Sequence, residues 1–304
     1  MTGGRVGGTA TVRVPATSAN LGPGFDALGL ALDLYDEVTA EVTASGLSVQ
    51  AEGEGAAALP HDESHLIVRA MRRAWDDLGT TAPGISVRGI NRIPHGRGLG
   101  SSAAAICAGV LLARELTQDG RELLDDDAVL DLCAAIEGHP DNVAACLLGG
   151  LTVAWREPAS YRAVRLEPSG DVRPVLLVPP AASSTETARG MLPASVPHAD
   201  AAFNAARAAL LVAALTGHSG SLLAATADRL HQPYRAAAMP ASADLVADLR
   251  AAGIPAAISG AGPSVLALTT SPQQSDAALG REPQGWSARG LAVARSGAQL
   301  VRRD

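Results

Sequence analysis

Hydrophobic positions along the chain recur with two different periods. Alternation of hydrophobic and polar residues, which is typical of a half-buried strand, runs over residues 9–14, 36–44 and 85–93. Spacings of three and four residues, which are typical of an amphipathic helix, begin at residue 63 and end on Gly79. The other elements predicted for the first half are helices over 101–116, 127–137 and 139–150 and a strand over 151–155.

The second half shows the same mixture of elements. We predict a strand over 173–179, helices from about residue 185 and over 200–215, 219–230 and 243–253, two short strands joined by a Gly-Pro turn over 256–268, and a strand-like end over 289–301. This mixture favours an α+β fold with two subdomains. The polar stretch 156–171 is the expected boundary, which divides the chain into residues 1–160 and 161–304. The glycine-rich stretch 17–32 is expected to be an ordered loop.

The composition excludes several classes of function. A net charge of −7 and only 3% aromatic residues offer a nucleic acid neither electrostatic attraction nor many stacking surfaces. All 24 basic residues are arginines. The chain therefore cannot use chemistry that needs a lysine, such as a Schiff base, a Walker A loop or a lysine general base.

Neither the start of the chain nor its cysteines indicate export. The first residues contain no apolar leader, and the longest apolar runs, 103–113 and 208–215, are shorter than a membrane span. Cys107, Cys133 and Cys146 are scattered and form no C-x-x-C pair. We expect a reduced, cytoplasmic protein with no cysteine metal site and no membrane partner.

The stretch RGLGSSAAAIC, residues 97–107, predicts a glycine-rich loop that turns into a helix. Gly98–Ala103 matches G-x-G-x-x-[GA], but a dinucleotide site also needs a strand after the helix, and here a second helix is predicted. Another interpretation is a serine-capped helix after a glycine turn. A third is an anion cradle, in which glycines let the backbone approach a phosphate and the helix N-terminus adds free N–H groups. Since Leu99 is the only bulky residue from Gly98 to Ala103, the cradle is favoured.

Three segments resemble the motifs of the GHMP kinases, a family of galacto-, homoserine, mevalonate and phosphomevalonate kinases, and they follow one another along the chain in the order of the family. PHGRGLGSSAAA (94–105) is similar to the P-x-x-x-G-L-G-S-S-A-A motif of this family. VPATSANLGPGFDALGLAL (14–32) resembles the N-terminal motif of the members that act on homoserine, with Asn20 and Asp26 where mevalonate kinases usually carry a lysine. ISGAGPSVLAL (258–268) resembles the C-terminal glycine motif. The resemblance spans nearly the whole chain.

The resemblance implies a fold and an activity. The fold would be α+β, with an N-terminal subdomain like ribosomal protein S5 domain 2 and a ferredoxin-like C-terminal subdomain. The activity would be phosphorylation of L-homoserine to O-phospho-L-homoserine, in threonine biosynthesis, with ATP and Mg²⁺ as cofactors. The alternatives are a kinase of the same family for a different primary alcohol and a non-catalytic nucleotide-binding regulator. No nucleic-acid or membrane partner is expected, and a homodimer is left open.

The resemblance also implies roles for individual residues, each of which has an ordinary structural interpretation as well. Glu137 could be a solvated helix end, His139 and Asn142 turn residues, and the arginines surface residues. His65 stands where many relatives have asparagine, so their adenine contact is not carried over, and no residue is an obvious general base. The implied nucleotide-binding residues are Pro94, Gly98, Leu99, Gly100, Ser101, Ser102 and Ala103, the metal ligands Ser102 and Glu137, and the substrate-binding residues Asn20, Asp26, His139, Asn142, Thr185, Arg189, Arg235 and Gly260.

Overall fold

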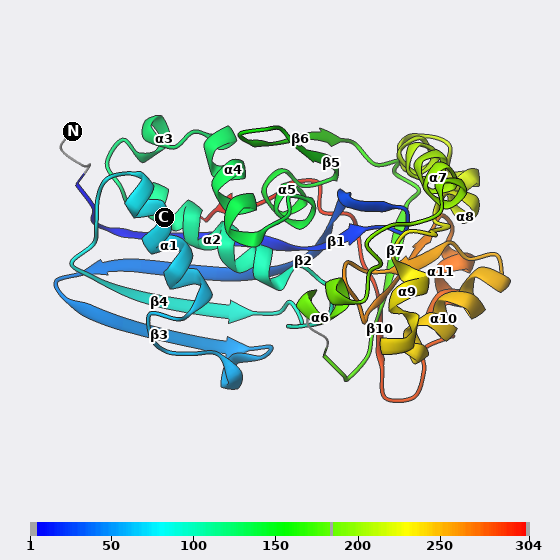
Figure 1. The fold of residues 1–304 in the computed structure, drawn as a ribbon. Helices are drawn as coiled ribbons and strands as arrows, with labels where there is room; N and C mark the ends of the chain where they lie inside the picture. The colour runs from blue at the N-terminus through cyan, green and yellow to red at the C-terminus, as the bar shows by residue number, and fades with distance from the viewer. Residues whose placement is uncertain (1–4, 183–184, 302–304) are drawn as a thin grey trace.

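Two β-sheets with helices packed against them make up the protein (Figure 1). The computed structural model describes residues 5–182 and 185–301, the side chains of 185–187 excepted. The first sheet has seven strands, with β11-β1-β2-β4-β3 in order and β5 and β6 branching from β2. The second sheet has four strands in the order β10-β7-β9-β8. The α+β prediction is therefore confirmed.

The elements have the following bounds. The strands are β1 (Thr9–Asn20), β2 (Gly24–Thr43), β3 (Gly46–Gly53), β4 (Gly84–Asn91), β5 (Leu151–Arg156), β6 (Tyr161–Leu166), β7 (Arg173–Val178), β8 (Ala256–Ile258), β9 (Val265–Thr269), β10 (Ser287–Gly290) and β11 (Gln299–Leu300). The helices are α1 (Leu66–Asp77), α2 (Ser101–Glu115), α3 (Gly120–Leu123), α4 (Asp126–Glu137), α5 (Asp141–Leu148), α6 (Thr185–Gly190), α7 (His198–Thr216), α8 (Leu222–Ala225), α9 (Gln232–Arg235), α10 (Pro240–Ala251) and α11 (Pro272–Leu279).

The motif at residues 14–32, the first of the three along the chain, lies on a long antiparallel hairpin of β1 and β2. Thr9 pairs with Glu41 at one end of the hairpin and Ala19 with Gly29 near the other. The stretch 17–32, expected to be a loop, is strand apart from the turn at 21–23, so that expectation was wrong. The reason is that the buried residues here include Thr17, Ser18 and Asn20, so this part of β1 shows neither the alternation of a half-buried strand nor the hydrophobic run of a fully buried one.

Helices α1, α2, α4 and α5 lie together over the first sheet (Figure 1). The helices predicted over 101–116 and 127–137 are α2 and α4, so both predictions are confirmed. Helices α2 and α5 pack on β1, and α1 packs on α2, where Trp75 Nε1 donates a hydrogen bond to the Ala113 carbonyl at 3.2 Å. This packing fixes the N-terminus of α2 and the ends of α4 and α5 at one place.

The three cysteines, scattered along the sequence, converge in the core between these helices. Cys107 on α2 forms hydrogen bonds with Cys133 on α4 and with Cys146 on α5, and all three are free and buried. Burial raises the pKa of the Cys107 thiol well above its usual value, so the thiol stays protonated. Over the described ranges, no cluster of three or more His, Cys, Asp or Glu side chains could hold a metal ion.

The second sheet does not correspond to a simple second half of the chain. The strands predicted around 173–179 and 256–268 are β7, β8 and β9, which pair in antiparallel fashion. By contrast, β6 pairs with β5, and β11 near the end of the chain pairs with β1, both in the first sheet. The boundary expected after residue 160 therefore falls inside the β5–β6 hairpin. Because β6 is an edge strand with no fully buried residue, its sequence resembles a polar linker.

Helix α7 is longer than the apolar run 208–215 suggested. By length and composition alone this helix could cross a membrane. One such helix is only weak evidence of a membrane span. One of its side chains makes polar contacts within the protein: Asn204 Nδ2 donates to the Pro23 carbonyl at 2.7 Å, and Asn204 Oδ1 accepts from the Arg229 N–H at 3.1 Å. These contacts join α7 to the turn of the first motif.

Candidate active site

Gly98, Leu99 and Gly100 form the turn that leads into α2. The φ angles of Gly98 and Gly100 are +71° and +67°, a left-handed conformation that costs glycine little. A Cβ on Gly98 would collide with the carbonyl oxygen of Ser259, and a Cβ on Gly100 would collide with Thr17 Oγ1. The N-cap of α2 is Gly100, which has no side chain to bond the first N–H groups of the helix. The serine-cap interpretation is therefore wrong, and the N–H groups can bind an anion.

Two other observations bear on this loop. The helix that follows it leads into α3 and α4, and the next strand is β5, so the arrangement that a dinucleotide fingerprint requires is absent from this stretch. Leu99 and Ala103 are at most 1% exposed, and Pro94 is also buried. These three residues, which were predicted to contact the nucleotide, therefore have buried side chains.

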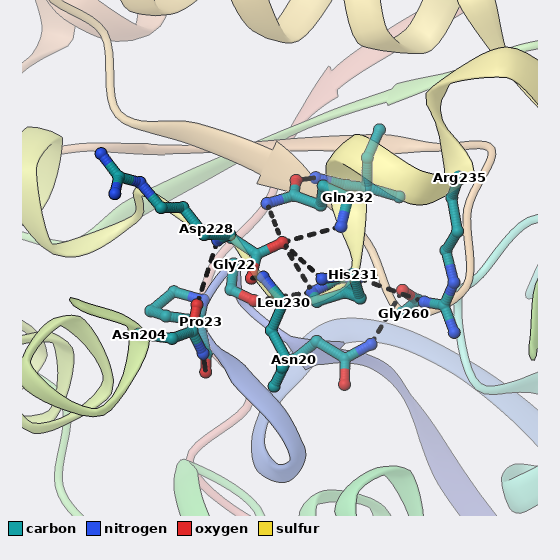
Figure 2. Close-up of polar contacts among 12 residues, drawn as sticks. Asn20, Gly22, Pro23, Asn204, Asp228, Leu230, His231, Gln232, Arg235 and Gly260 are labelled. Atoms are coloured by element: carbon teal, nitrogen blue, oxygen red, sulfur yellow. Dashed lines mark hydrogen bonds and ion pairs between the residues drawn. The ribbon is translucent and has the colours of Figure 1, made fainter. Parts of the chain in front are cut away.

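The third motif holds the phosphate loop from the side of the second sheet. Ser259 Oγ donates to the Gly98 carbonyl at 2.7 Å. The Gly260 N–H donates to the Ala19 carbonyl at 3.0 Å, and the Gly260 carbonyl accepts from Asn20 Nδ2 at 2.9 Å (Figure 2). The three motifs, which are far apart in the sequence, therefore meet at one place.

Glu137 ends α4 and reaches the first turn of α2. Ser102 Oγ donates to Glu137 Oε1 at 2.6 Å. Burial raises the pKa of the Glu137 carboxyl above its ordinary value, and the hydrogen bond from Ser102 opposes that shift. A half-buried carboxylate beside a hydroxyl is the kind of oxygen pair that Mg²⁺ takes together with water and phosphate. The geometry favours Ser102 over Ser101 as the partner of Glu137.

His139 and Asp141 form a hydrogen-bonded pair at the start of α5. His139 Nδ1 lies 2.7 Å from Asp141 Oδ1, which also accepts the Asn142 N–H at 2.7 Å. Burial by itself would lower the pKa of His139, but the hydrogen bond and the negative charges of Asp141 and Glu137 raise it above its ordinary value. The raised pKa favours the protonated form of the His139 ring. Asn142 Oδ1 accepts from Thr17 Oγ1 at 2.7 Å, which joins α5 to β1.

Asp26 and Arg189, which were assigned to opposite ends of a substrate, bond to each other. Arg189 Nη1 lies 3.0 Å from Asp26 Oδ2, and Arg189 Nη2 lies 2.6 Å from Asp26 Oδ1. The hydrogen bonds with Asp26 raise the pKa of the Arg189 guanidinium. Asn20 Oδ1 accepts the Asp26 N–H at 3.0 Å, which helps to hold Asp26 at its left-handed φ of +54°. Asn20 therefore connects Asp26 to Gly260.

Arg235, the last residue of α9, is 2% exposed. Arg235 Nε donates to the Ala188 carbonyl at 3.0 Å. The guanidinium carbons of Arg235 and Arg189 lie 5.4 and 5.6 Å from the centre of the Phe25 ring. Burial, and then the charge of Arg189, lower the pKa of Arg235. Two guanidinium groups thus lie near the same ring.

One cavity of ≈ 330 Å³ brings most of the predicted residues together. Thr185 begins α6, but its side chain lies outside the described part of the structure. Sequence reasoning missed Phe25 and Asp141 as lining residues, although both stand inside quoted motifs next to predicted ones. The predicted residues that line the cavity are Asn20, Asp26, Gly98, Gly100, Ser101, Ser102, Glu137, His139, Asn142, Arg189, Arg235 and Gly260.

A second cavity of ≈ 180 Å³ adjoins the first at Ser101 and Ser102. Its walls include apolar side chains of β2, β4 and α1, and His65 at the N-cap of α1. His65 is 4% exposed, and its Nδ1 has no hydrogen-bond partner among the residues that the structure describes. Burial, assisted by His61 and His95, lowers the pKa of His65, so the imidazole is neutral.

Comparison with known proteins identifies similar sequences and folds. The profile of the GHMP kinases N terminal domain matches residues 65–150, and that of the GHMP kinases C terminal domain matches residues 209–281. The homoserine kinase of Streptomyces avermitilis is 58% identical over 290 residues, 95% of each chain. That of Mycolicibacterium smegmatis is 53% identical over 272 residues, 87% of this chain and 86% of the relative.

Solved structures agree with the sequence comparison. The crystal structure of homoserine kinase from Cytophaga hutchinsonii is 28% identical, covers 96% of this chain and 97% of its own, and has a TM-score of 0.83. The Leishmania major mevalonate kinase is 18% identical, covers 98% of this chain and 97% of its own, and has a TM-score of 0.66, which shows the same fold.

Proposed function

The chain belongs to the GHMP kinase family, and on that premise we propose that it transfers a phosphoryl group from ATP to the side-chain hydroxyl of L-homoserine. The product is O-phospho-L-homoserine. The observation that carries the proposal is that a phosphate loop, a fixed carboxylate and two arginines border one cavity. Phosphoryl transfer needs mainly positioning and charge stabilisation, which these groups can supply.

The charges of the cavity complement an amino acid. Homoserine carries an ammonium group, a carboxylate and a hydroxyl, so its site needs an anion, cations and an open path to the phosphates. Asp26 supplies the anion, while Arg189 and Arg235 supply planar guanidinium groups that match a carboxylate. Mevalonate has a carboxylate and a hydroxyl but no ammonium group. Because an unpaired buried charge is costly, Asp26 selects for the zwitterion.

The adjoining cavity supports ATP as the phosphoryl donor. Its mouth borders Ser101 and Ser102, so a base bound there leaves its phosphates at the N-terminus of α2. The apolar walls suit the faces of a purine ring. The unpaired Nδ1 of His65 offers the base a hydrogen-bonding group in place of the asparagine of many relatives.

Glu137 and Ser102 fit a magnesium ion. No ion pair with Glu137 is found among the described residues, and its hydrogen bond from Ser102 brings two oxygen ligands together. With fewer than three protein ligands, the ion would take its other ligands from phosphate and water. Bound Mg²⁺ supplies positive charge that offsets negative charge on the phosphates. Glu137 and Ser102 orient the phosphates toward the substrate cavity.

The proton of the substrate hydroxyl passes to the phosphate in this proposal. Among the residues that line the cavity, His139 is the one that could act as a general base. The hydrogen bond with Asp141 raises the pKa of His139, however, so the ring donates a proton more readily than it accepts one. We assign His139 and Asn142 to substrate positioning. Because the chain contains no lysine, it cannot use the pair of an aspartate and a lysine that the mevalonate-kinase arrangement needs.

Product identification tests the proposal. The protein is incubated with ATP, Mg²⁺ and L-homoserine, and the product is analysed by ³¹P NMR and mass spectrometry. We expect stoichiometric ADP and O-phospho-L-homoserine. If another primary alcohol is phosphorylated and homoserine is not, the chain is a different small-molecule kinase of the family. If neither is phosphorylated while ATP still binds, it is a nucleotide-binding regulator; the paired Glu137 and Ser102 argue against that outcome.

We also propose a cytoplasmic location, as expected from the composition of the chain. A homodimer is left open, and size-exclusion chromatography with light scattering decides it.

A further inference from the structure

Arg235 is a buried cation that forms no ion pair among the described residues, and its direct hydrogen-bond partners are neutral. Its guanidinium contacts the Ala188 carbonyl, the Phe25 ring and Nδ1 of His231, which lies 3.2 Å from Arg235 Nη1. In the described part of the chain, none of these hydrogen-bond partners is a carboxylate. The carboxylates of Asp26, Asp228 and Asp141 act on Arg235 only through their charge, without a direct bond. Since a buried charge gains from a direct counter-charge, the guanidinium can bind an anionic group of the substrate.

The hydrogen bonds of His231 define its tautomer. His231 Nε2 lies 2.7 Å from the Gly22 carbonyl, which can only accept, so Nε2 carries the hydrogen (Figure 2). Arg235 can only donate, so His231 Nδ1 must be the acceptor. Only the neutral Nε2–H form satisfies both contacts. Burial lowers the pKa of His231, whose exposure is 0%, and this keeps the ring in that form.

The turn before α9 holds His231 in place. Asp228 accepts backbone N–H groups from Leu230 at 2.8 Å, His231 at 3.2 Å and Gln232 at 2.7 Å. The His231 ring lies 5.2 Å from the Phe25 ring, centre to centre. Figure 2 shows His231 between the turn of the first motif at Gly22 and the side chain of Arg235.

We propose that His231 is a positioning residue for substrate binding. Its Nδ1 accepts a hydrogen bond from Arg235 and so orients the guanidinium, while its Nε2–H donates to the Gly22 carbonyl and so fixes the ring to the turn at residues 21–23. The inference rests on the proposed function, because it takes the substrate carboxylate as the anion that Arg235 binds. The same contacts could also serve folding alone. The two roles predict different kinetics.

Two amide variants separate the two hydrogen bonds. In His231→Gln the amide nitrogen can replace Nε2 and keep the bond to Gly22, but Arg235 loses its acceptor. In His231→Asn the amide oxygen can replace Nδ1 and keep the bond to Arg235, but Gly22 loses its donor. Each variant loses one buried bond, so both should unfold at a lower temperature than the wild type.

A positioning role predicts a split in the kinetic constants. We expect the homoserine KM to rise about tenfold in His231→Gln and clearly less in His231→Asn, with the ATP KM little changed in both. His218→Gln, a substitution of an exposed histidine before α8, is the control and should leave both KM values unchanged. A folded His231→Gln with the wild-type homoserine KM overturns the proposal, as does an equal rise in both KM values in both variants.

A second measurement needs no variant. In wild-type protein labelled with ¹⁵N-histidine, the His231 signals should show a hydrogen on Nε2 and an accepting Nδ1. Addition of homoserine should shift the Nδ1 signal, and addition of a non-hydrolysable ATP analogue should not. A hydrogen on Nδ1, or no shift with homoserine, contradicts the proposal. If the wild type binds no homoserine at all, the proposed function itself fails.

Discussion

Arg189 and Asp26 form a two-point ion pair across the substrate cavity, with N–O distances of 3.0 and 2.6 Å. Their side chains are 37% and 35% exposed, so a ligand can reach both. Each charge is compensated by the other before substrate binds. A zwitterion can replace both partners at once, because its ammonium group binds Asp26 and its carboxylate binds Arg189. An alcohol with a carboxylate alone would leave Asp26 without a partner.

The substitution Asp26→Asn should weaken homoserine binding and leave ATP binding unchanged. Hydrogen bonds to charged groups contribute about 1.5–3 kcal/mol, so the homoserine KM should rise by roughly 10- to 100-fold. The ATP KM should stay within twofold, because the phosphate loop is untouched. Steady-state kinetics with each substrate varied in turn measures both constants.

The same variant offers a control on the ion pair. In Asp26→Asn, Arg189 no longer has its carboxylate partner. We expect 4-hydroxybutyrate, which lacks the ammonium group, to inhibit the variant more strongly than the wild type. Equal inhibition of both proteins, or an unchanged homoserine KM, would show that Asp26 does not hold the ammonium group.

The substitution Glu137→Gln should preserve the fold and lower kcat by at least ~10²-fold, since it removes the charge with which the residue would hold Mg²⁺. The amide can still accept the hydrogen bond from Ser102, so the melting temperature should change little. Glu122→Gln, on the exposed surface of α3, is the matched control and should have wild-type kcat. Wild-type kcat in Glu137→Gln at saturating Mg²⁺ would make Glu137 a structural helix end only.

The substitution Gly98→Ala should damage both stability and ATP binding. A left-handed φ costs a residue with a Cβ about 1–2 kcal/mol, and here the Cβ also meets the Ser259 carbonyl. Thermal unfolding and the ATP KM are the readouts. Gly170→Ala is the control, because a Cβ there has nothing within 4 Å, and its unfolding should be unchanged. Equal melting temperatures for the two variants would contradict the close packing of loop and third motif.

The stability contributed by His65 and His231 should fall as the pH drops below about 6.5, the ordinary pKa of histidine, whereas His139, whose pKa is raised, contributes with the opposite sign. Burial lowers the folded-state pKa of His65 and His231, so the unfolded chain binds protons first as the pH falls. The stability that these neutral rings contribute is complete above about pH 6.5 and is lost below it, at no more than about 1.4 kcal/mol per pH unit for each ring. Melting temperatures between pH 7.5 and 5.5 measure the effect. The double variant His65→Asn, His231→Asn should lose less stability than the wild type over that range, and parallel curves would contradict this origin.

Local sequence patterns predicted the elements that combine hydrophobic residues with turn residues at their ends. Helices α2 and α4 and strands β7 to β9 lie where hydrophobic spacing and turn residues placed them. Two strands escaped for opposite physical reasons. The end of β1 is buried but contains the polar residues Thr17, Ser18 and Asn20, so it shows no hydrophobic run. Strand β6 is an edge strand without a fully buried residue, so it resembles a polar linker.

The site could be predicted only where residues stand inside a motif. The resemblance led to Asp26, Glu137 and Arg189, but nothing in the sequence indicated that Asp26 and Arg189 bond to each other across 163 positions. His231 had no local signal either, since its partner Gly22 lies 209 positions away. Asp141 was within reach of sequence reasoning, because it follows His139 by two residues. Long-range contacts of this kind depend on how the two sheets pack together.

The most direct measurement of the central claim is ADP release by the wild-type protein across a panel of homoserine, mevalonate, threonine, shikimate and galactose. Each alcohol is tested with ATP, with and without Mg²⁺. The charges of the cavity predict the highest kcat/KM for homoserine, with a kcat of roughly 1–100 s⁻¹ that requires Mg²⁺. A higher kcat/KM for any alcohol without an ammonium group, or ADP release that is independent of the alcohol added, would contradict the account.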